Sequence, residues 1–166
     1  NRLDTHSSKW DNLLDLYGLE KSHSIPMWVA DMDFKSPDCI REALAKIEDH
    51  GVFGYYGDER SYLESICWWM KTRHKWDIQS DWIFTTNGLV SGFALCVNCF
   101  TNPLDSVILI TPVYHRLSQI LKENNRQILE LPLKKVNNRY QMDFDRWEYL
   151  LTGEERMLVI CSPLNP

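Results

Sequence analysis

The amino-acid sequence predicts an α/β fold built on a mainly parallel sheet. Ser106–Thr111 (SVILIT) is a continuous apolar run of strand length, the pattern expected of a parallel strand covered on both faces. Residues 157–161 (MLVIC) repeat this pattern near the end of the chain. Segments with helical periodicity alternate with these runs, which favours helices packed on the sheet and right-handed crossovers between its strands.

The first 35 residues are predicted to form an N-terminal arm, and residues 36–166 to form the first part of the main domain. The arm is polar with aromatic interruptions. One short helix is expected around residues 10–17, and residues 25–30 (IPMWVA) are expected to be extended around Pro26.

A helix is predicted to follow the arm. Ser36 is expected to be its N-cap, with Pro37 at the first helical position, and Gly51 suits a left-handed cap at its end. Its apolar residues recur at i, i+4 and i+7: Ile40, Leu44 and Ile47. This is the pattern of an amphipathic helix.

Residues 51–57 (GVFGYYG) combine glycines with exposed-type aromatic residues, and loops of this kind often bind a partner or ligand. The alternative is that these rings cover the edge of the core. A second helix is expected to run to about Lys75, with its apolar face formed by Leu63, Ile66, Cys67 and Met70.

Residues 81–100 (DWIFTTNGLVSGFALCVNCF) predict a strand over 82–86, a turn at Asn87-Gly88 and a helix over Leu89–Phe100. The N–H groups at the start of such a helix can hold an anion such as a phosphate. An ordinary strand-to-helix turn is the alternative. Neither a dinucleotide-binding glycine motif nor a nucleotide P-loop is present in the sequence.

The rest of the chain continues the alternation. A helix is expected after Pro112, a strand over 127–131, a solvated charged turn over 134–139 and a short helix over 143–151. Polar or aromatic residues follow three predicted strands, at 86–88, 111–114 and 162–165. Because ligands bind beyond the carboxyl ends of parallel strands, these three segments predict one binding site.

Composition narrows the class of protein. The 44% hydrophobic and 12% aromatic content is ample for a packed core. The net charge of -5, without a basic run, disfavours nucleic acid as a partner. No apolar run approaches the roughly 20 residues of a membrane span, and the N-terminus does not resemble a signal peptide, so we expect a cytoplasmic protein without membrane contact.

The cysteines are odd in number and lie within apolar segments, which favours reduced core thiols over disulfides: Cys39, Cys67, Cys96, Cys99 and Cys161. The C-x-x-C pair at 96–99 falls late in a predicted helix and not at a helix N-terminus, the position typical of reactive thiols. No second pair completes a zinc site, so neither redox chemistry nor a metal is expected.

Five motifs occur in a familiar order: ADMDF (30–34), HGVFGY (50–55), TNG (86–88), TPVY (111–114) and SPLNP (162–166). Together they resemble the N-terminal part of fold-type I pyridoxal-phosphate (PLP) enzymes of the class I/II aminotransferase superfamily. With KWD (9–11), ADMDF and GVFGY are similar to the cystathionine β-lyase-like C–S lyases of the MalY/PatB type. The resemblance implies a three-layer α/β/α large domain, present in part, and PLP as cofactor.

The resemblance also implies roles for individual residues. The backbone amides of Leu89 and Val90, after Gly88, would hold the cofactor phosphate. Tyr114 would stack on the pyridine ring, and Asn165 would donate a hydrogen bond to the phenolate oxygen. Tyr55 would reach the phosphate of the cofactor in the neighbouring subunit, which implies a homodimer with composite sites. Ala30 and Asp31 would lie near the carboxylate of the amino-acid substrate.

The sequence departs from the family pattern at Thr85–Asn87, where many members have glycine or serine. The resemblance therefore does not assign side-chain contacts to the phosphate at these positions. The family's Schiff-base lysine, pyridine-nitrogen aspartate and carboxylate-binding arginine are expected beyond Pro166. Ser7-Ser8-Lys9 only superficially resembles the lysine signature, because it lies in the polar arm. The chain is therefore expected to be the first portion of an enzyme roughly twice as long or longer, and to be inactive alone.

The implied activity is PLP-dependent β-elimination on cystathionine or a cysteine-type amino acid, giving pyruvate, ammonia and a thiol. An aminotransferase of the same superfamily is the alternative within the family. A different class, a degenerate α/β interaction or regulatory module, is the non-enzyme alternative.

Overall fold

The computed structural model describes residues 2–20 and 23–165, and the chain divides into two compact units, 1–59 and 60–166. The first unit contains α1 (Ser8–Asp11), α2 (Leu13–Tyr17) and α3 (Asp38–His50). The single arm helix expected around 10–17 is therefore wrong in detail, because Asn12 interrupts the helical hydrogen bonding and separates two short helices. The domain boundary at residue 36 stays a prediction.

Helix α3 confirms the predicted cap at Gly51 and corrects the predicted start. Gly51 is left-handed, with φ 70°, and its N–H donates to the Ile47 carbonyl at 3.2 Å. Pro37 has an extended ψ of 147°, so it takes the N-cap position that Ser36 was expected to hold, and the helix begins at Asp38. The carboxylate of Asp38 accepts a hydrogen bond from Arg41 at 2.9 Å.

The second unit carries a three-stranded parallel sheet in the order β2 (Gln127–Pro132), β1 (Ser106–Thr111), β5 (Met157–Val159). Val107 of β1 pairs with Ile128 on one side and Met157 on the other. The helices of this unit are α4 (Arg60–His74), the 3-10 helix η2 (Ser80–Trp82), α5 (Leu89–Phe100), α6 (His115–Glu123) and α7 (Phe144–Leu150).

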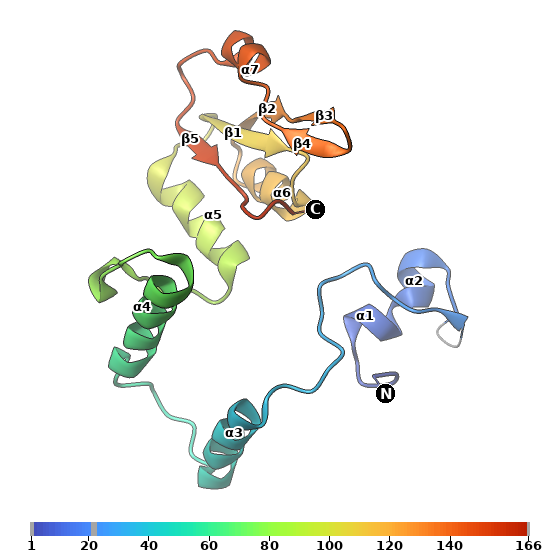
Figure 1. Ribbon diagram of the computed structural model, residues 1–166, viewed down its shortest axis with the longest axis vertical. Coiled ribbons are helices and arrows are strands. Elements are labelled where there is room, and N and C mark those ends of the chain that lie inside the picture. Colours follow the sequence, from blue (N-terminus) through green and yellow to red (C-terminus); the bar gives the residue numbers. More distant parts are fainter. Residues whose placement is uncertain (1, 21–22, 166) are drawn as a thin grey trace. The chain divides into compact units, whose positions relative to one another are not determined.

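The alternation of side chains along β1 builds two cores, one on each face of the sheet. Val107 and Leu109 pack with Val97 of α5 and with Ile120 and Leu121 of α6. Ile110 packs on the opposite face with Leu131 and with Trp147 of α7. Helices α5 and α6 thus cover one face and α7 the other (Figure 1), which confirms the predicted α/β/α layers around a parallel sheet.

Two local predictions are wrong. Residues 83–86 do not form a strand: Ile83 has extended angles, φ -101° and ψ 124°, but no strand within the described ranges pairs with this segment. The charged turn expected over 134–139 is instead a hairpin of β3 (Lys134–Val136) and β4 (Arg139–Gln141). Asn137 and Asn138 have φ of 49° and 61°, the two left-handed residues that a tight hairpin turn requires.

The C-terminal end of α5 is closed by Arg126, which is only 8% exposed. Its Nε donates to Thr101 Oγ1 at 2.9 Å, its Nη1 to the Asn124 carbonyl at 2.6 Å, and its Nη2 to the carbonyls of Thr101 at 2.6 Å and Val97 at 3.3 Å. A cation satisfies the helix carbonyls that lack an intrahelical donor and complements the negative end of the helix dipole.

The five cysteines are free thiols, but the expectation that they lie in the core is wrong for three of them: Cys39, Cys96 and Cys99 are exposed. None of these three side chains belongs to either of the two cores. No helix in the described ranges is both long enough and apolar enough to cross a membrane.

Candidate functional site

The candidate site lies at the start of α5, where the sequence predicted an anion site. Gly88 precedes the helix with φ 93° and ψ 151°, a conformation that residues with a Cβ rarely adopt. The first helical hydrogen bond runs from the Gly92 N–H to the Gly88 carbonyl at 3.1 Å. Helix geometry therefore leaves the N–H groups of Leu89, Val90 and Ser91 without an intrahelical acceptor.

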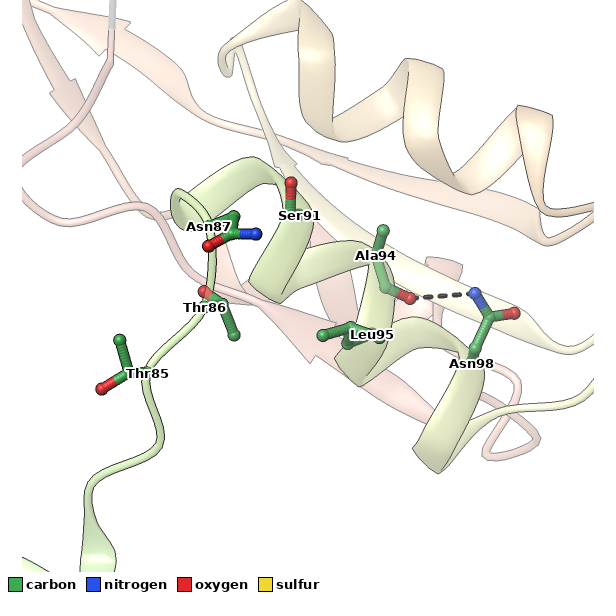
Figure 2. A pocket seen from close by; sticks show the side chains of 7 residues that line it. All are labelled: Thr85, Thr86, Asn87, Ser91, Ala94, Leu95 and Asn98. Atoms are coloured by element: carbon green, nitrogen blue, oxygen red, sulfur yellow. Dashed lines mark hydrogen bonds between the residues drawn. The ribbon is translucent and has the colours of Figure 1, made fainter. Parts of the chain in front are cut away.

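The segment before the helix folds back against it. The Thr86 hydroxyl donates to the Gly88 carbonyl at 3.1 Å, and the Gly88 N–H donates to the Thr86 carbonyl at 2.8 Å. A Cβ at Gly92 would lie 2.8 Å from Thr86 Oγ1, so glycine there permits the close approach of Thr86 to α5. Figure 2 shows Thr85 and Thr86 in the incoming segment beside the helix.

This turn and one side of α5 line a hollow of about 550 Å³: Thr85, Thr86, Asn87, Ser91, Ala94, Leu95 and Asn98. Asn87, Thr86 and Ser91 lie around the start of the helix, whereas Ala94, Leu95 and Asn98 lie further along it (Figure 2). All the lining residues are uncharged. Hydroxyls, amides and helix N–H groups are donors that suit a phosphate.

Tyr114 and Asn165 lie beyond the ends of neighbouring parallel strands. Tyr114 follows β1, is the N-cap residue of α6, and holds its ring 4.9 Å from the ring of His115 in an edge contact. Asn165 follows β5 and is exposed. Because a short segment, residues 101–105, joins the end of α5 to the start of β1, the first turn of α5 lies toward the same edge of the sheet as Tyr114.

The other predicted site residues belong to the first compact unit, so the structure does not place them beside Gly88. Tyr55 is fully exposed in the glycine-rich loop, and Ala30 is exposed as well. Asp31 is half-buried, and its carboxylate accepts a hydrogen bond from Arg2 at 2.7 Å. The roles of all these residues stay predictions.

Sequence reasoning missed a polar cluster around Asp31 and Asp33. Lys9 is only 7% exposed, and its ammonium donates to Asp33 Oδ2 at 2.6 Å and to the Asp31 carbonyl at 2.8 Å. The Trp10 indole N–H donates to Asp33 Oδ1 at 2.7 Å. The available signal was a pair of carboxylates in ADMDF and two cations in the arm, but nothing in their spacing predicted contact.

These contacts lower the pKa of both carboxyl groups. The hydrogen bond from Lys9, together with that from Trp10, lowers the pKa of Asp33 to about 2. The hydrogen bond from Arg2 lowers the pKa of Asp31, and Asp31 in turn raises the pKa of Arg2. Both carboxylates are therefore charged, and fully paired, at neutral pH.

We expect the first unit to lose stability as the pH falls from about 4 to about 2. A lowered folded pKa stabilises the folded state above the unfolded value of 3.8, and this contribution disappears as the pH falls through about 2. The chemical shift of the Trp10 indole N–H should follow this titration by NMR with a midpoint near 2. The Trp28 indole, which donates to the Lys9 carbonyl, is the internal control. A Trp10 midpoint at 3.8 would contradict the ion pair.

Residues 23–166 match the family described as aminotransferase class I and II. Cystathionine β-lyase PatB of Bacillus subtilis is 37% identical over 99% of this chain and 42% of its own length. Protein MalY of Escherichia coli is 28% identical over the whole chain and 43% of its own length.

Among solved structures, cystalysin from Treponema denticola, described as containing pyridoxal 5'-phosphate, is 39% identical with a TM-score of 0.91. The match covers all of this chain and 42% of the cystalysin chain. The chain thus spans about two fifths of the length of each of these relatives.

Proposed function

Since the chain belongs to the aminotransferase class I and II family, we propose that it forms part of a PLP-dependent carbon–sulfur β-lyase. The observation that carries the proposal is the helix start at Gly88, combined with similarity to proteins named as cystathionine β-lyase and cystalysin. The proposed substrate is cystathionine or a cysteine-type amino acid, and the proposed products are pyruvate, ammonia and a thiol. Because the chain spans 42% of PatB, this activity is proposed for the full-length protein.

The residues present fit the phosphate of PLP. Gly88 opens the turn, and the N–H groups of Leu89 and Val90 point out of the helix end, where the positive end of the helix dipole favours an anion. Gly92 permits Thr86 to lie against the helix, and Thr85, Thr86 and Ser91 line the hollow beside α5. A neutral lining leaves the phosphate charge to be balanced by these backbone dipoles.

The rest of the cofactor would meet residues from the carboxyl edge of the sheet. Tyr114 would stack on the pyridine ring, with His115 contacting the Tyr114 ring from its edge. Asn165 would donate its amide N–H to the phenolate oxygen, and Ala30 and Asp31 would border the substrate carboxylate. When bound, PLP supplies an electron sink that lets a thiolate leave from Cβ once the Cα proton is removed.

The direct test supplies the full-length protein with PLP and cystathionine, and measures pyruvate and free thiol. The lyase proposal expects both products to appear in equal amounts without an added 2-oxoacid. Amino transfer that requires a 2-oxoacid and releases no thiol would refute it.

An aminotransferase is the second candidate, because the matched family carries that description. It would use the same residues for the phosphate and the ring, and would differ in where the Cα proton is returned. The same assay separates the two candidates. A protein that binds no PLP and catalyses neither reaction would favour the α/β interaction module.

We also propose a homodimer in which Tyr55 of one subunit donates a hydrogen bond to the phosphate held by the other. Phe53, Tyr55 and Tyr56 are exposed on a loop whose glycines give it little rigidity of its own, and a two-fold interface would cover this apolar surface. A location in the cytoplasm stays a prediction.

Subunit mixing tests the role of Tyr55. Mixing Tyr55→Phe subunits with subunits that lack the Schiff-base lysine should give heterodimers with one intact site. We therefore expect the mixture to be more active than the Tyr55→Phe homodimer and more active than the homodimer that lacks the lysine. Mixed dimers with confirmed exchange but no gain would exclude a contact across the interface.

A further inference from the structure

The Lys9 ammonium is buried in the first unit, although it belongs to a short helix in a polar segment. Burial of a charge is unfavourable unless the charge is paired and hydrogen-bonded. Lys9 meets both needs on one loop: Asp33 Oδ2 lies 2.6 Å from its Nζ and the Asp31 carbonyl 2.8 Å away. Its side chain therefore links α1 to the loop that carries Asp31.

Other contacts hold the same loop. Arg2 Nη1 donates to the Met32 carbonyl and to Asp33 Oδ1, each at 3.0 Å, while Arg2 Nη2 donates to Asp31 Oδ2 at 2.7 Å. The Asp31 N–H donates to the Val29 carbonyl at 2.8 Å, which closes a turn at Ala30. Lys9 and Arg2 therefore both hold the segment from Val29 to Asp33 through hydrogen bonds.

The cluster is also balanced in charge. Two cations, Lys9 and Arg2, face two carboxylates, Asp31 and Asp33. A substrate carboxylate beside an unpaired Asp31 would meet a like charge. Paired with Arg2, Asp31 presents a neutral edge, and the ammonium of Lys9 fixes the position of the Asp31 backbone.

We propose that Lys9 is a positioning residue, which sets the Ala30-Asp31 backbone at the place where the amino-acid carboxylate binds. The inference rests on the proposed function, because it takes Ala30 and Asp31 as the border of the substrate site. It concerns recognition of the carboxylate and not bond cleavage, so it holds for a lyase and for an aminotransferase alike.

The test is made on the full-length protein with PLP bound. Methionine carries the α-carboxylate but no leaving group at Cβ, and methionine amide lacks the carboxylate charge. Both are measured as competitive inhibitors. For Lys9→Met we expect inhibition by methionine to weaken roughly tenfold, since a displaced positioning group costs this much or more. Inhibition by the amide should change less than about twofold, and the cofactor absorption spectrum should not change.

Lys35→Met is the matched control, because Lys35 is an exposed lysine close to the same motif and its substitution makes the same charge change. It should leave both inhibition constants unchanged. Lys9→Arg should restore part of the methionine affinity. Equal weakening of methionine and its amide by Lys9→Met, or no weakening of either, would overturn the inference.

If Lys9→Met does not fold, Asp33→Asn decides the question, because it weakens the same pair from the half-exposed side. We expect Asp33→Asn to weaken inhibition by methionine more than inhibition by methionine amide, with a smaller loss than in Lys9→Met. If Asp33→Asn left both inhibition constants at their wild-type values, or changed both by the same factor, the inference would be overturned. Failure of the proposed function is seen separately, in wild-type protein that neither releases thiol nor transfers an amino group. If the wild-type protein is active and Lys9→Met has the same inhibition constants as the wild type, only the role of Lys9 is disproved.

Discussion

Replacing Arg126 with methionine should lower the free energy of unfolding of the second unit by about 3 kcal/mol, because buried carbonyl groups lose a charged donor. The guanidinium makes four hydrogen bonds while only 8% exposed, and methionine fills a similar volume without any donor. The carbonyl of Thr101 at the end of α5 and the carbonyl of Asn124 at the end of α6 would remain without that partner. Urea unfolding followed by circular dichroism measures the change, with an unchanged m-value as the sign that the folded state is intact.

Arg116→Met is the matched control, since Arg116 lies exposed on α6 and donates one hydrogen bond to Gln119. Its effect should stay within about 0.5 kcal/mol. Arg126→Lys keeps the charge but loses the planar fork, so it should fall between the two. If Arg126→Met and Arg116→Met unfolded at the same urea concentration, the buried cap would contribute nothing to stability.

Gly88→Ala should weaken PLP binding by roughly ten- to a hundredfold, because a Cβ at φ 93° and ψ 151° costs about 1–3 kcal/mol and the turn would relax to avoid it. Relaxation of Gly88 would reorient the N–H groups of Leu89 and Val90, which the proposed function assigns to the phosphate. Titration of the full-length protein with PLP, followed by the visible absorption of the bound cofactor, measures the affinity.

Gly153→Ala separates backbone strain from phosphate binding. Gly153 also has a positive φ, 83°, with no atom within 4 Å of an added Cβ, and it lies in the loop between α7 and β5. Both variants should lose stability to a similar extent, but only Gly88→Ala should lose PLP affinity. An equal affinity in the two variants would argue against the start of α5 as the phosphate site.

The site itself was predictable only in part. The turn at Gly88, which we propose binds the phosphate, was predicted from a local pattern, a glycine between a β-type segment and an apolar helix, and α5 begins at Leu89 as predicted. The polar cluster of Lys9 and Asp33 was not predictable, since these residues are separated by more than twenty positions and only folding brings their atoms to 2.6 Å. Arg126 was missed for the same reason, because its partners lie at the end of α5.

The amino-acid sequence by itself determined the elements whose preference is local or depends on burial alone. These are the apolar strand Ser106–Thr111, the helix Leu89–Phe100 and the left-handed cap at Gly51. The tertiary structure decided which extended segments became strands. Residues 83–86 have the same β-type composition as β1 but no partner strand in the described part of the chain, whereas β1 has a partner on each side. A strand is stabilised by hydrogen bonds and side-chain pairs to its neighbours, so its formation depends on residues distant in sequence.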